Sequence, residues 1–233
     1  MRRYAVVFDI DETLLCSKRR KACAGMRDFD AYDVHSITVE NVAFDVLVRP
    51  WARRLLYWLS HQAVDIYLLT AGSNEYCQAV MALFNGLATA AGETPPIAGG
   101  ASSRTSDDPP APKTFAHVLP AGVPMAHALA IDNDRQAWAR SDRAHVLPAV
   151  DWHPNRPATH DALIDVWLLL AHALEALDGA GEDAHAGDVV DDLLEDLVKG
   201  SIVGSGPSAA DRAAVRDLLL APAICARRPA ERS

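Results

Sequence analysis

Tyr4–Leu15, with the sequence YAVVFDIDETLL, changes abruptly from an apolar run to a polar one. The run Tyr4–Phe8 shows no alternation, which is typical of a strand covered on both faces in a parallel sheet flanked by helices. Asp9 and Asp11 follow it directly, at the carboxyl end, where such sheets place their ligands. Two carboxylates held together there need a cation, a proton or both. Because an Asp-x-Asp pair also caps ordinary turns, its meaning depends on partners further along the chain.

The composition is that of a folded, acidic protein. The chain has 233 residues, half of them hydrophobic, and a formal net charge of -9, which suits one sizeable α/β domain. The negative charge argues against general nucleic-acid binding, which needs a basic face. No apolar run reaches the ~18 residues of a membrane span, and the first strand begins too early to leave room for a signal peptide. We expect an intracellular protein, nuclear or cytoplasmic, without membrane contact or direct nucleic-acid binding.

The cysteines indicate neither a metal site nor a disulfide framework. They are Cys16, Cys23, Cys77 and Cys225. None has the CxxC spacing of a zinc site, and their scatter is not that of a small disulfide-stapled domain. We therefore expect reduced thiols.

Two further apolar strands also end in polar groups. Val64–Leu69 leads to Thr70, and Ala126–Ile131 leads to Asp132 and Asn133. Thus three strands each end in a group suited to phosphate or metal chemistry. After Thr70, Ser73 is expected to cap a helix over residues 74–85, with Gly86 as its stop. A strand, a turn of small residues and a helix amino terminus together make a natural anion site.

The remaining elements follow from their patterns. Residues 37–48 predict a hairpin around Glu40 and Asn41, and Arg49-Pro50-Trp51 opens a helix. Residues 88–112 predict a long loop or partly ordered insertion that ends at Lys113. A fourth strand is expected over 144–149, and helices over 159–177 and 188–199. Residues 200–233 predict a Gly/Ser linker, a short helix and a loose tail.

A basic run, Ser17–Lys21, lies just past Asp11 in a polar segment that extends from Cys16 to His35. It is interpreted as a solvated loop, a weak nuclear address, or a patch that attracts a multiply phosphorylated substrate. The sequence leaves these three alternatives open.

Together these motifs resemble a known family. Asp9, Asp11 and Thr13 match the Asp-x-Asp-x-Thr signature of the haloacid-dehalogenase superfamily of phosphatases. Within it, residues 4–195 resemble the FCP/SCP-like phosphatases, with an NLI-interacting-factor-like domain, that act on the carboxyl-terminal repeats of RNA polymerase II. The further matching elements are Val48-Arg49-Pro50, Tyr67–Ala71 with Tyr76, Lys113, Ala130–Asn133 with Trp138, Asp151–Asn155, His160–Leu163 and Asp188-Val189. The segment before Lys113 departs from the pattern because it lacks the aromatic residues of the family's substrate-recognition region.

The resemblance implies a Rossmann-like α/β fold with a parallel sheet flanked by helices, an inserted β-hairpin and a helical carboxyl-terminal extension. Residues 1–199 would form the phosphatase domain. It also implies catalysis by Asp9 as nucleophile and Asp11 as acid and base, phosphate binding by Thr70 and Lys113, and Mg2+ held by Asp9, Asp11 and Asp132 or Asn133.

The expected function is therefore a Mg2+-dependent phosphatase that forms an aspartyl-phosphate. Its expected partner is a phosphoprotein or phosphopeptide bearing phosphoserine or phosphothreonine, such as the RNA polymerase II repeats. Two alternatives remain open: a phosphatase for a small molecule or a nucleic-acid end, and a non-catalytic adaptor with the same fold. The adaptor is disfavoured because every expected catalytic position is present.

Overall fold

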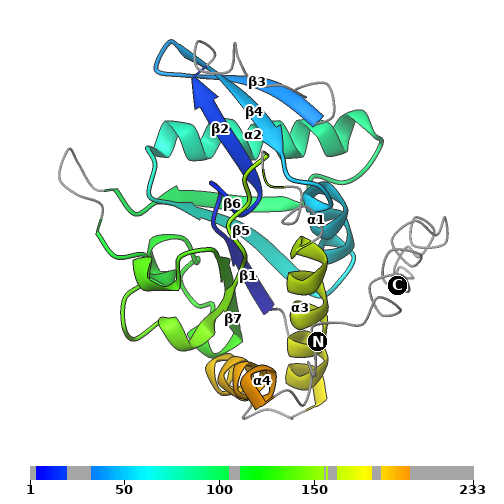
Figure 1. The fold of residues 1–233 in the computed structure, drawn as a ribbon, viewed down its shortest axis with the longest axis vertical. Coiled ribbons are helices and arrows are strands. Elements are labelled where there is room, and N and C mark those ends of the chain that lie inside the picture. Colours follow the sequence, from blue (N-terminus) through cyan, green and yellow to red (C-terminus); the bar gives the residue numbers. More distant parts are fainter. Residues whose placement is uncertain are drawn as a thin grey trace.

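The computed structural model describes residues 4–19, 33–104, 111–154, 156, 162–179 and 185–199. Its central layer is a five-stranded sheet, in which every neighbouring pair is parallel, in the order β6-β5-β1-β7-β8 (Figure 1). The strands are Tyr4–Phe8 (β1), Val64–Thr70 (β5), Ile97–Ser102 (β6), Ala128–Asp132 (β7) and Val146–Pro148 (β8). The predicted Rossmann-like α/β fold is confirmed.

β1 is the middle strand, which explains its unbroken apolar sequence. It pairs with β5 on one side and with β7 on the other. Because side chains alternate across a strand, Val6 and Phe8 enter the core on one face while Ala5 and Val7 enter the core on the other. No residue of β1 is more than 3% exposed.

Helices cover one face of the sheet, and shorter elements cover the other. Ala52–Ser60 (α1), Asn74–Ala90 (α2) and Ala162–Gly179 (α3) pack their apolar faces against the side that holds Val6 and Phe8. On the opposite side lies a segment with four short 3-10 helices, whose Phe115 and Trp138 complete the second core. These helices are Phe115–His117 (η3), Met125–His127 (η4), Arg135–Ala137 (η5) and Arg143–His145 (η6). Ala186–Lys199 (α4) packs against α3 and η6.

A second, antiparallel sheet lies beside α2 (Figure 1). Its strands are Leu15–Arg19 (β2), Asp33–Val39 (β3) and Val42–Val48 (β4), in the order β2-β4-β3. The predicted hairpin is confirmed as β3 and β4, joined at Glu40 and Asn41, which both have positive φ as a tight hairpin turn requires. The interpretation of residues 16–35 as a solvated loop is wrong at both of its described ends. Residues 16–19 pair with β4 as part of an additional strand, and residues 33–35 belong to β3.

Two expectations around α2 are also wrong. The helix continues through Gly86 to Ala90, because Phe84 and Ala88 on either side of the glycine are buried in the core. The expected loop over 88–112 contains the end of α2 and all of β6. In β6, a Cβ on Gly100 would lie 2.8 Å from the Cys77 sulfur, so glycine allows α2 to approach the strand closely.

The remaining predicted elements are present with shifted ends. β7 and β8 each begin two residues later than expected, since η4 and η6 precede them. α3 and α4 are found, but Thr159, the expected first cap, lies outside the described residues. The division at residue 199 stays a prediction, because residues 200–233 also lie outside them. Among the described helices, none combines the length and apolar character needed to cross a bilayer.

Candidate active site

The carboxyl edge of the central sheet brings Asp9 and Asp132 together. Asp9 follows β1, Asp132 ends β7, and these two strands are neighbours. The Asp9 N–H donates to the Ile131 carbonyl at 2.9 Å, which continues the pairing past Phe8. Thr70 ends β5, the neighbour of β1 on the other side. The polar groups predicted at the ends of three strands therefore lie at one edge of the sheet.

Lys113 bridges the two aspartates. Its ammonium nitrogen lies 2.5 Å from Asp9 Oδ1 and 2.7 Å from Asp132 Oδ2, and all three residues are buried. The lysine backbone is fixed on both sides, since its N–H donates to the Ala137 carbonyl and its carbonyl accepts from the Ala139 N–H, each at 2.8 Å. The sequence names Lys113 as a site residue, and the structure supplies its two partners.

Asp132 also accepts hydrogen bonds from two further donors. Trp138 Nε1 donates to Oδ2 at 2.8 Å, and the Asp134 N–H donates to Oδ1 at 2.7 Å. Both oxygens of this carboxylate are therefore already engaged within the protein. The sequence identifies Trp138 only as a motif match, and its contact with Asp132 follows from the short turn that contains η5.

Burial and charge set the protonation of this cluster. Burial raises the pKa of Asp9 to about 7, although the Lys113 ammonium opposes the rise. Burial opposes the charge of Lys113, but the Asp9 and Asp132 carboxylates outweigh it and raise the lysine pKa. The Asp9 and Asp132 carboxylates share the single ammonium of Lys113, which offsets only one of their two negative charges when both are ionised. Such a site favours an additional cation.

Asp11 has hydroxyl partners instead of a cation. Asp11 Oδ1 accepts from the Tyr76 hydroxyl at 2.7 Å and from the Ser17 hydroxyl at 2.9 Å. Burial raises the pKa of Asp11, while these two hydrogen bonds oppose the rise. A hydroxyl both donates and accepts, so it can serve a carboxylate or a carboxylic acid, whereas an ammonium only donates. Residue type gives no sign of the Ser17 contact, because it depends on the pairing of β2 with β4.

Arg49 holds the loop that connects the two aspartates to β2. Arg49 is 1% exposed, and its guanidinium donates to the Thr13 carbonyl at 3.0 Å and to the Glu12 carbonyl at 3.4 Å. Burial lowers the pKa of Arg49 to about 10, so it remains a cation at neutral pH. Arg49 therefore stabilises the turn at Glu12, a non-glycine residue with a φ of 62°.

Thr13 connects this loop to Asn133. The Thr13 hydroxyl donates to Asn133 Oδ1 at 3.0 Å and accepts from the Asn133 N–H at 3.2 Å. The predicted metal residue Asn133 thus lies beside the Asp-x-Asp-x-Thr loop. Thr70, predicted to bind phosphate, is buried, and its hydroxyl accepts from the Gly72 N–H at 3.0 Å. Ser73 caps α2 as predicted, by accepting from the Tyr76 N–H.

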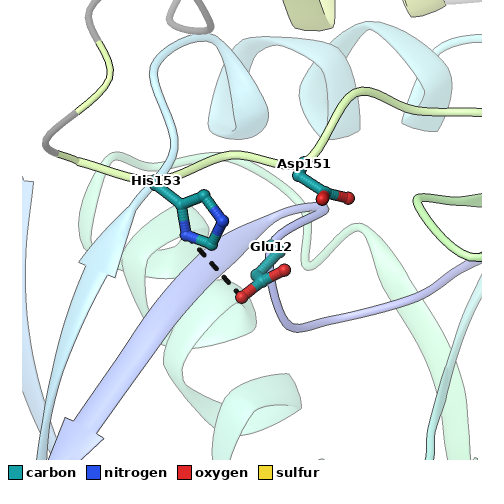
Figure 2. A group of neighbouring side chains, drawn as sticks. All are labelled: Glu12, Asp151 and His153. Atoms are coloured by element: carbon teal, nitrogen blue, oxygen red, sulfur yellow. Dashed lines mark ion pairs between the residues drawn. The ribbon is translucent and has the colours of Figure 1, made fainter.

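A second group of potential metal ligands lies next to this loop. Figure 2 shows Glu12, Asp151 and His153, with an ion pair of 3.7 Å between His153 Nδ1 and Glu12 Oε1. Their ligand atoms lie within 4.8 Å of one another. Asp151 also accepts from Asn133 Nδ2 at 3.0 Å, which joins this group to the predicted metal residues. The sequence did not predict it, because Glu12 lies in a segment far from the one that contains Asp151 and His153.

The chain is similar to known proteins both in its sequence pattern and in its fold. The family model described as NLI interacting factor-like phosphatase matches residues 4–183. A solved structure of Fcp1, described as an essential RNA polymerase II CTD phosphatase, has a TM-score of 0.51 and 15% identity, and the match covers 87% of this chain and 66% of that one. No curated protein matches the chain in sequence.

A second solved structure is a fission yeast RNA polymerase II CTD phosphatase Fcp1 variant bound to beryllium fluoride. It has a TM-score of 0.51 and 14% identity, and the match covers 88% of this chain and 68% of that one. The chain thus spans about two thirds of the length of these solved structures, and slightly less than that for the first. At such identities the similarity is one of fold.

Proposed function

The chain belongs to the NLI interacting factor-like phosphatase family, and on this premise we propose that it hydrolyses phosphoserine or phosphothreonine in a protein, using Mg2+ and an aspartyl-phosphate on Asp9. The family assignment confirms the predicted resemblance and supports a phosphoric monoester hydrolase activity of the haloacid-dehalogenase type. The metal, the intermediate, the residue roles and the substrate are the parts that we propose.

One observation carries the proposal: the two carboxylates of the Asp-x-Asp pair have partners of different chemistry. Asp9 contacts an ammonium, which can only donate and so favours the ionised form that a nucleophile needs. Asp11 contacts two hydroxyls, which accept from a carboxylic acid as readily as they donate to a carboxylate. This is the difference expected between a nucleophile and a group that acts first as acid and then as base.

The donor set fits Mg2+, which prefers hard oxygen ligands. The Asp9 and Asp132 carboxylates carry more negative charge than the Lys113 ammonium between them offsets, which favours an additional cation at this place. We propose that the Asp9 carboxylate, the Asp11 carbonyl and Asn133 Oδ1 would hold it. Asp132 would instead orient Lys113, because its two oxygens accept from three donors, whereas Asn133 Oδ1 accepts, among the described residues, from the Thr13 hydroxyl alone. The bound ion would offset phosphoryl charge that otherwise repels the nucleophile.

In the first step an Asp9 oxygen attacks phosphorus, and the bond from phosphorus to the serine or threonine oxygen breaks. Asp11 gives its proton to that leaving oxygen. Lys113 has three N–H donors, of which two are directed at Asp9 and Asp132, so the third remains for a phosphoryl oxygen. The Thr70 hydroxyl would donate to another phosphoryl oxygen, because its contact with the Gly72 N–H uses the hydroxyl only as an acceptor.

In the second step Asp11, now a carboxylate, takes a proton from the attacking water. The oxygen of that water bonds to phosphorus, the bond between phosphorus and Asp9 breaks, and inorganic phosphate leaves. Both aspartates then have their starting protonation states, which balances the cycle.

A flexible phosphoprotein is the proposed substrate for two reasons. The Fcp1 proteins similar in fold are described as phosphatases of the RNA polymerase II carboxyl-terminal domain. In addition, Ser17 begins the basic run Ser17–Lys21 and contacts Asp11, so this run starts at the site itself. Arg20 and Lys21 lie outside the described residues. Cations near the site would favour a substrate with several phosphates, most strongly at low salt.

The test compares kcat/KM for multiply phosphorylated heptad peptides, singly phosphorylated ones, and a panel of sugar and nucleotide phosphates, at low and high salt. The proposal expects the multiply phosphorylated peptide to lead, with an advantage that shrinks as salt rises. A metabolite that leads by more than about tenfold, roughly 1.4 kcal/mol of transition-state preference, would instead support a small-molecule phosphatase. No reaction with any phosphate ester in Mg2+ would support the adaptor.

A further inference from the structure

The Asp11 side chain is held at one oxygen by residues from two other elements. Ser17 lies on β2, in the small sheet, and Tyr76 lies in the first turn of α2. Both hydroxyls donate to Oδ1, at 2.9 and 2.7 Å, and they lie 3.0 Å from each other. Among the hydrogen bonds of the described residues, none reaches Asp11 Oδ2. One oxygen is thus fixed while the other stays available.

We propose that Tyr76 and Ser17 are positioning residues that fix Asp11 Oδ1 and so direct Oδ2 at the leaving oxygen of the substrate. This inference rests on the proposed role of Asp11 as acid and base. Neither hydroxyl needs to touch the substrate for this purpose. Their effect is to limit rotation of the carboxyl group, so that proton transfer starts from a prepared geometry.

The environment of Tyr76 supports a specific role for its hydroxyl. The ring is wedged against the turn after β5, where a Cβ on Gly72 would lie 2.8 Å from Tyr76 Cδ1. On another side it contacts the Phe44 ring, with centroids 6.5 Å apart. A phenylalanine would satisfy these apolar contacts equally well. The hydroxyl of this 8% exposed residue is what a phenylalanine lacks, and it is directed at Asp11 and Ser17.

The arrangement also links the small sheet to the chemistry. β2 pairs with β4, and this pairing fixes the position of Ser17 opposite Val46. Tyr76 is fixed by the capped start of α2, where its N–H donates to Ser73 Oγ. Two independent elements therefore fix the position of the Asp11 carboxyl group. A precise catalytic geometry needs this kind of support.

The experiment uses Tyr76→Phe, Ser17→Ala and the double variant, each of which removes a hydroxyl and little else. Tyr57→Phe and Ser60→Ala on α1 are matched controls, because they remove the same groups outside the site. Two substrates are compared through kcat/KM: 4-nitrophenyl phosphate, whose leaving group needs no proton, and a phosphoserine peptide, whose alkoxide does. Thermal unfolding of each variant checks that it is folded.

We expect the double variant to lose at least about tenfold more kcat/KM on the phosphoserine peptide than on 4-nitrophenyl phosphate, since positioned acid catalysis contributes about 100-fold or more. In an Asp11→Asn background, the same substitutions should add no further selectivity. If the two hydroxyls had a merely structural role, their removal would lower kcat/KM equally for both substrates. Equal losses on both substrates, or no loss, would overturn the proposal, and Ser17→Ala alone decides it if the Tyr76 variants fail to fold.

The same data separate this inference from the function beneath it. If Asp11→Asn itself shows no selective loss on the peptide, the proposed acid role fails. If Asp11→Asn shows the selective loss while Tyr76→Phe and Ser17→Ala do not, the acid role stands and only the positioning role is wrong.

Discussion

The ammonium of Lys113 lies 2.5 Å from Asp9 Oδ1 in a buried part of the site. The variant Lys113→Met has a neutral side chain at this position and leaves Asp9 and Asp132 without their shared cation. We expect a loss of at least about 100-fold in kcat/KM, because the ammonium also offsets the negative charge on the phosphoryl oxygens. The free energy of unfolding should fall by about 3–5 kcal/mol, the usual cost of leaving buried charge uncompensated.

Both effects are measured with steady-state kinetics and urea unfolding. Arg54→Met, at an exposed position of α1, is the matched control for loss of a cation. Activity of Lys113→Met within about tenfold of the parent would contradict the role given to this lysine.

The pH dependence of the reaction should vary with Mg2+. Burial raises the pKa of Asp9 to about 7, and a nucleophile must be ionised to attack. At limiting Mg2+, kcat/KM should therefore fall as pH decreases below about 7. Saturating Mg2+ favours the carboxylate and should move this acidic limb to lower pH. Profiles at several Mg2+ concentrations test this, and an acidic limb that ignores Mg2+ would count against Asp9 as a ligand.

Asp132 and Asn133 should respond differently to mutation. Asn133→Ala is expected to raise the Mg2+ concentration for half-maximal activity by about tenfold or more, and Asn133→Asp to lower it by adding charge. Asp132→Ala should mainly reduce kcat, because Lys113 loses its second carboxylate. Mg2+ titrations of the three variants distinguish the roles.

His153→Ala serves as the control, because His153 belongs to the neighbouring group with Glu12 and Asp151. Its Mg2+ requirement should match that of the parent. If the Asn133 and Asp132 variants titrate like the parent while His153→Ala does not, the metal is held by the group in Figure 2 instead.

Stability should depend on pH through His145. Burial lowers the pKa of His145, whose Nδ1 lies 3.0 Å from the Ala128 carbonyl oxygen. The native state therefore binds fewer protons than the unfolded chain below the ordinary histidine value of 6.5. The contribution of His145 to the free energy of unfolding is therefore complete above pH 6.5. It is lost as the pH falls through the lowered pKa of the native state.

His145→Asn removes this titration, although it also loses the ring contacts with Phe115 and His185. We expect a free energy of unfolding lower by about 1–3 kcal/mol near neutral pH, with a smaller decrease on acidification than in the parent. Urea midpoints across the pH range measure both. His61→Asn, at the exposed end of α1, is the control. A decline parallel to that of the parent would show that His145 is not the group responsible.

The parts that follow from sequence are those that depend on local pattern. β1, β5 and β7 have the apolar runs of buried parallel strands, and their ends place Asp9, Thr70 and Asp132 at one edge. β6 escapes prediction because its glycines carry no apolar pattern. Gly100 is there to admit the Cys77 sulfur, a requirement visible only in three dimensions.

The partners of the site residues could not be predicted, for a similar reason. Lys113 is 104 residues from Asp9, and Tyr76 is 65 residues from Asp11. Residue type indicates what such side chains can do, but the packing of separate elements decides what they touch. Ser17 is closer in sequence, yet its contact with Asp11 depends on β2, a polar strand that is stabilised by pairing with β4.

The most direct test of the mechanism is the position of the phosphoryl group in Asp11→Asn. This variant lacks the base that activates water, so it should react once with 4-nitrophenyl phosphate in Mg2+ and then stop. Acid quenching followed by peptide mass spectrometry locates the phosphoryl group. The account predicts a phosphoryl group on Asp9 in an amount close to that of the nitrophenolate released in the burst. A burst with the phosphoryl group on another residue, or with Asp9 unmodified, would contradict it.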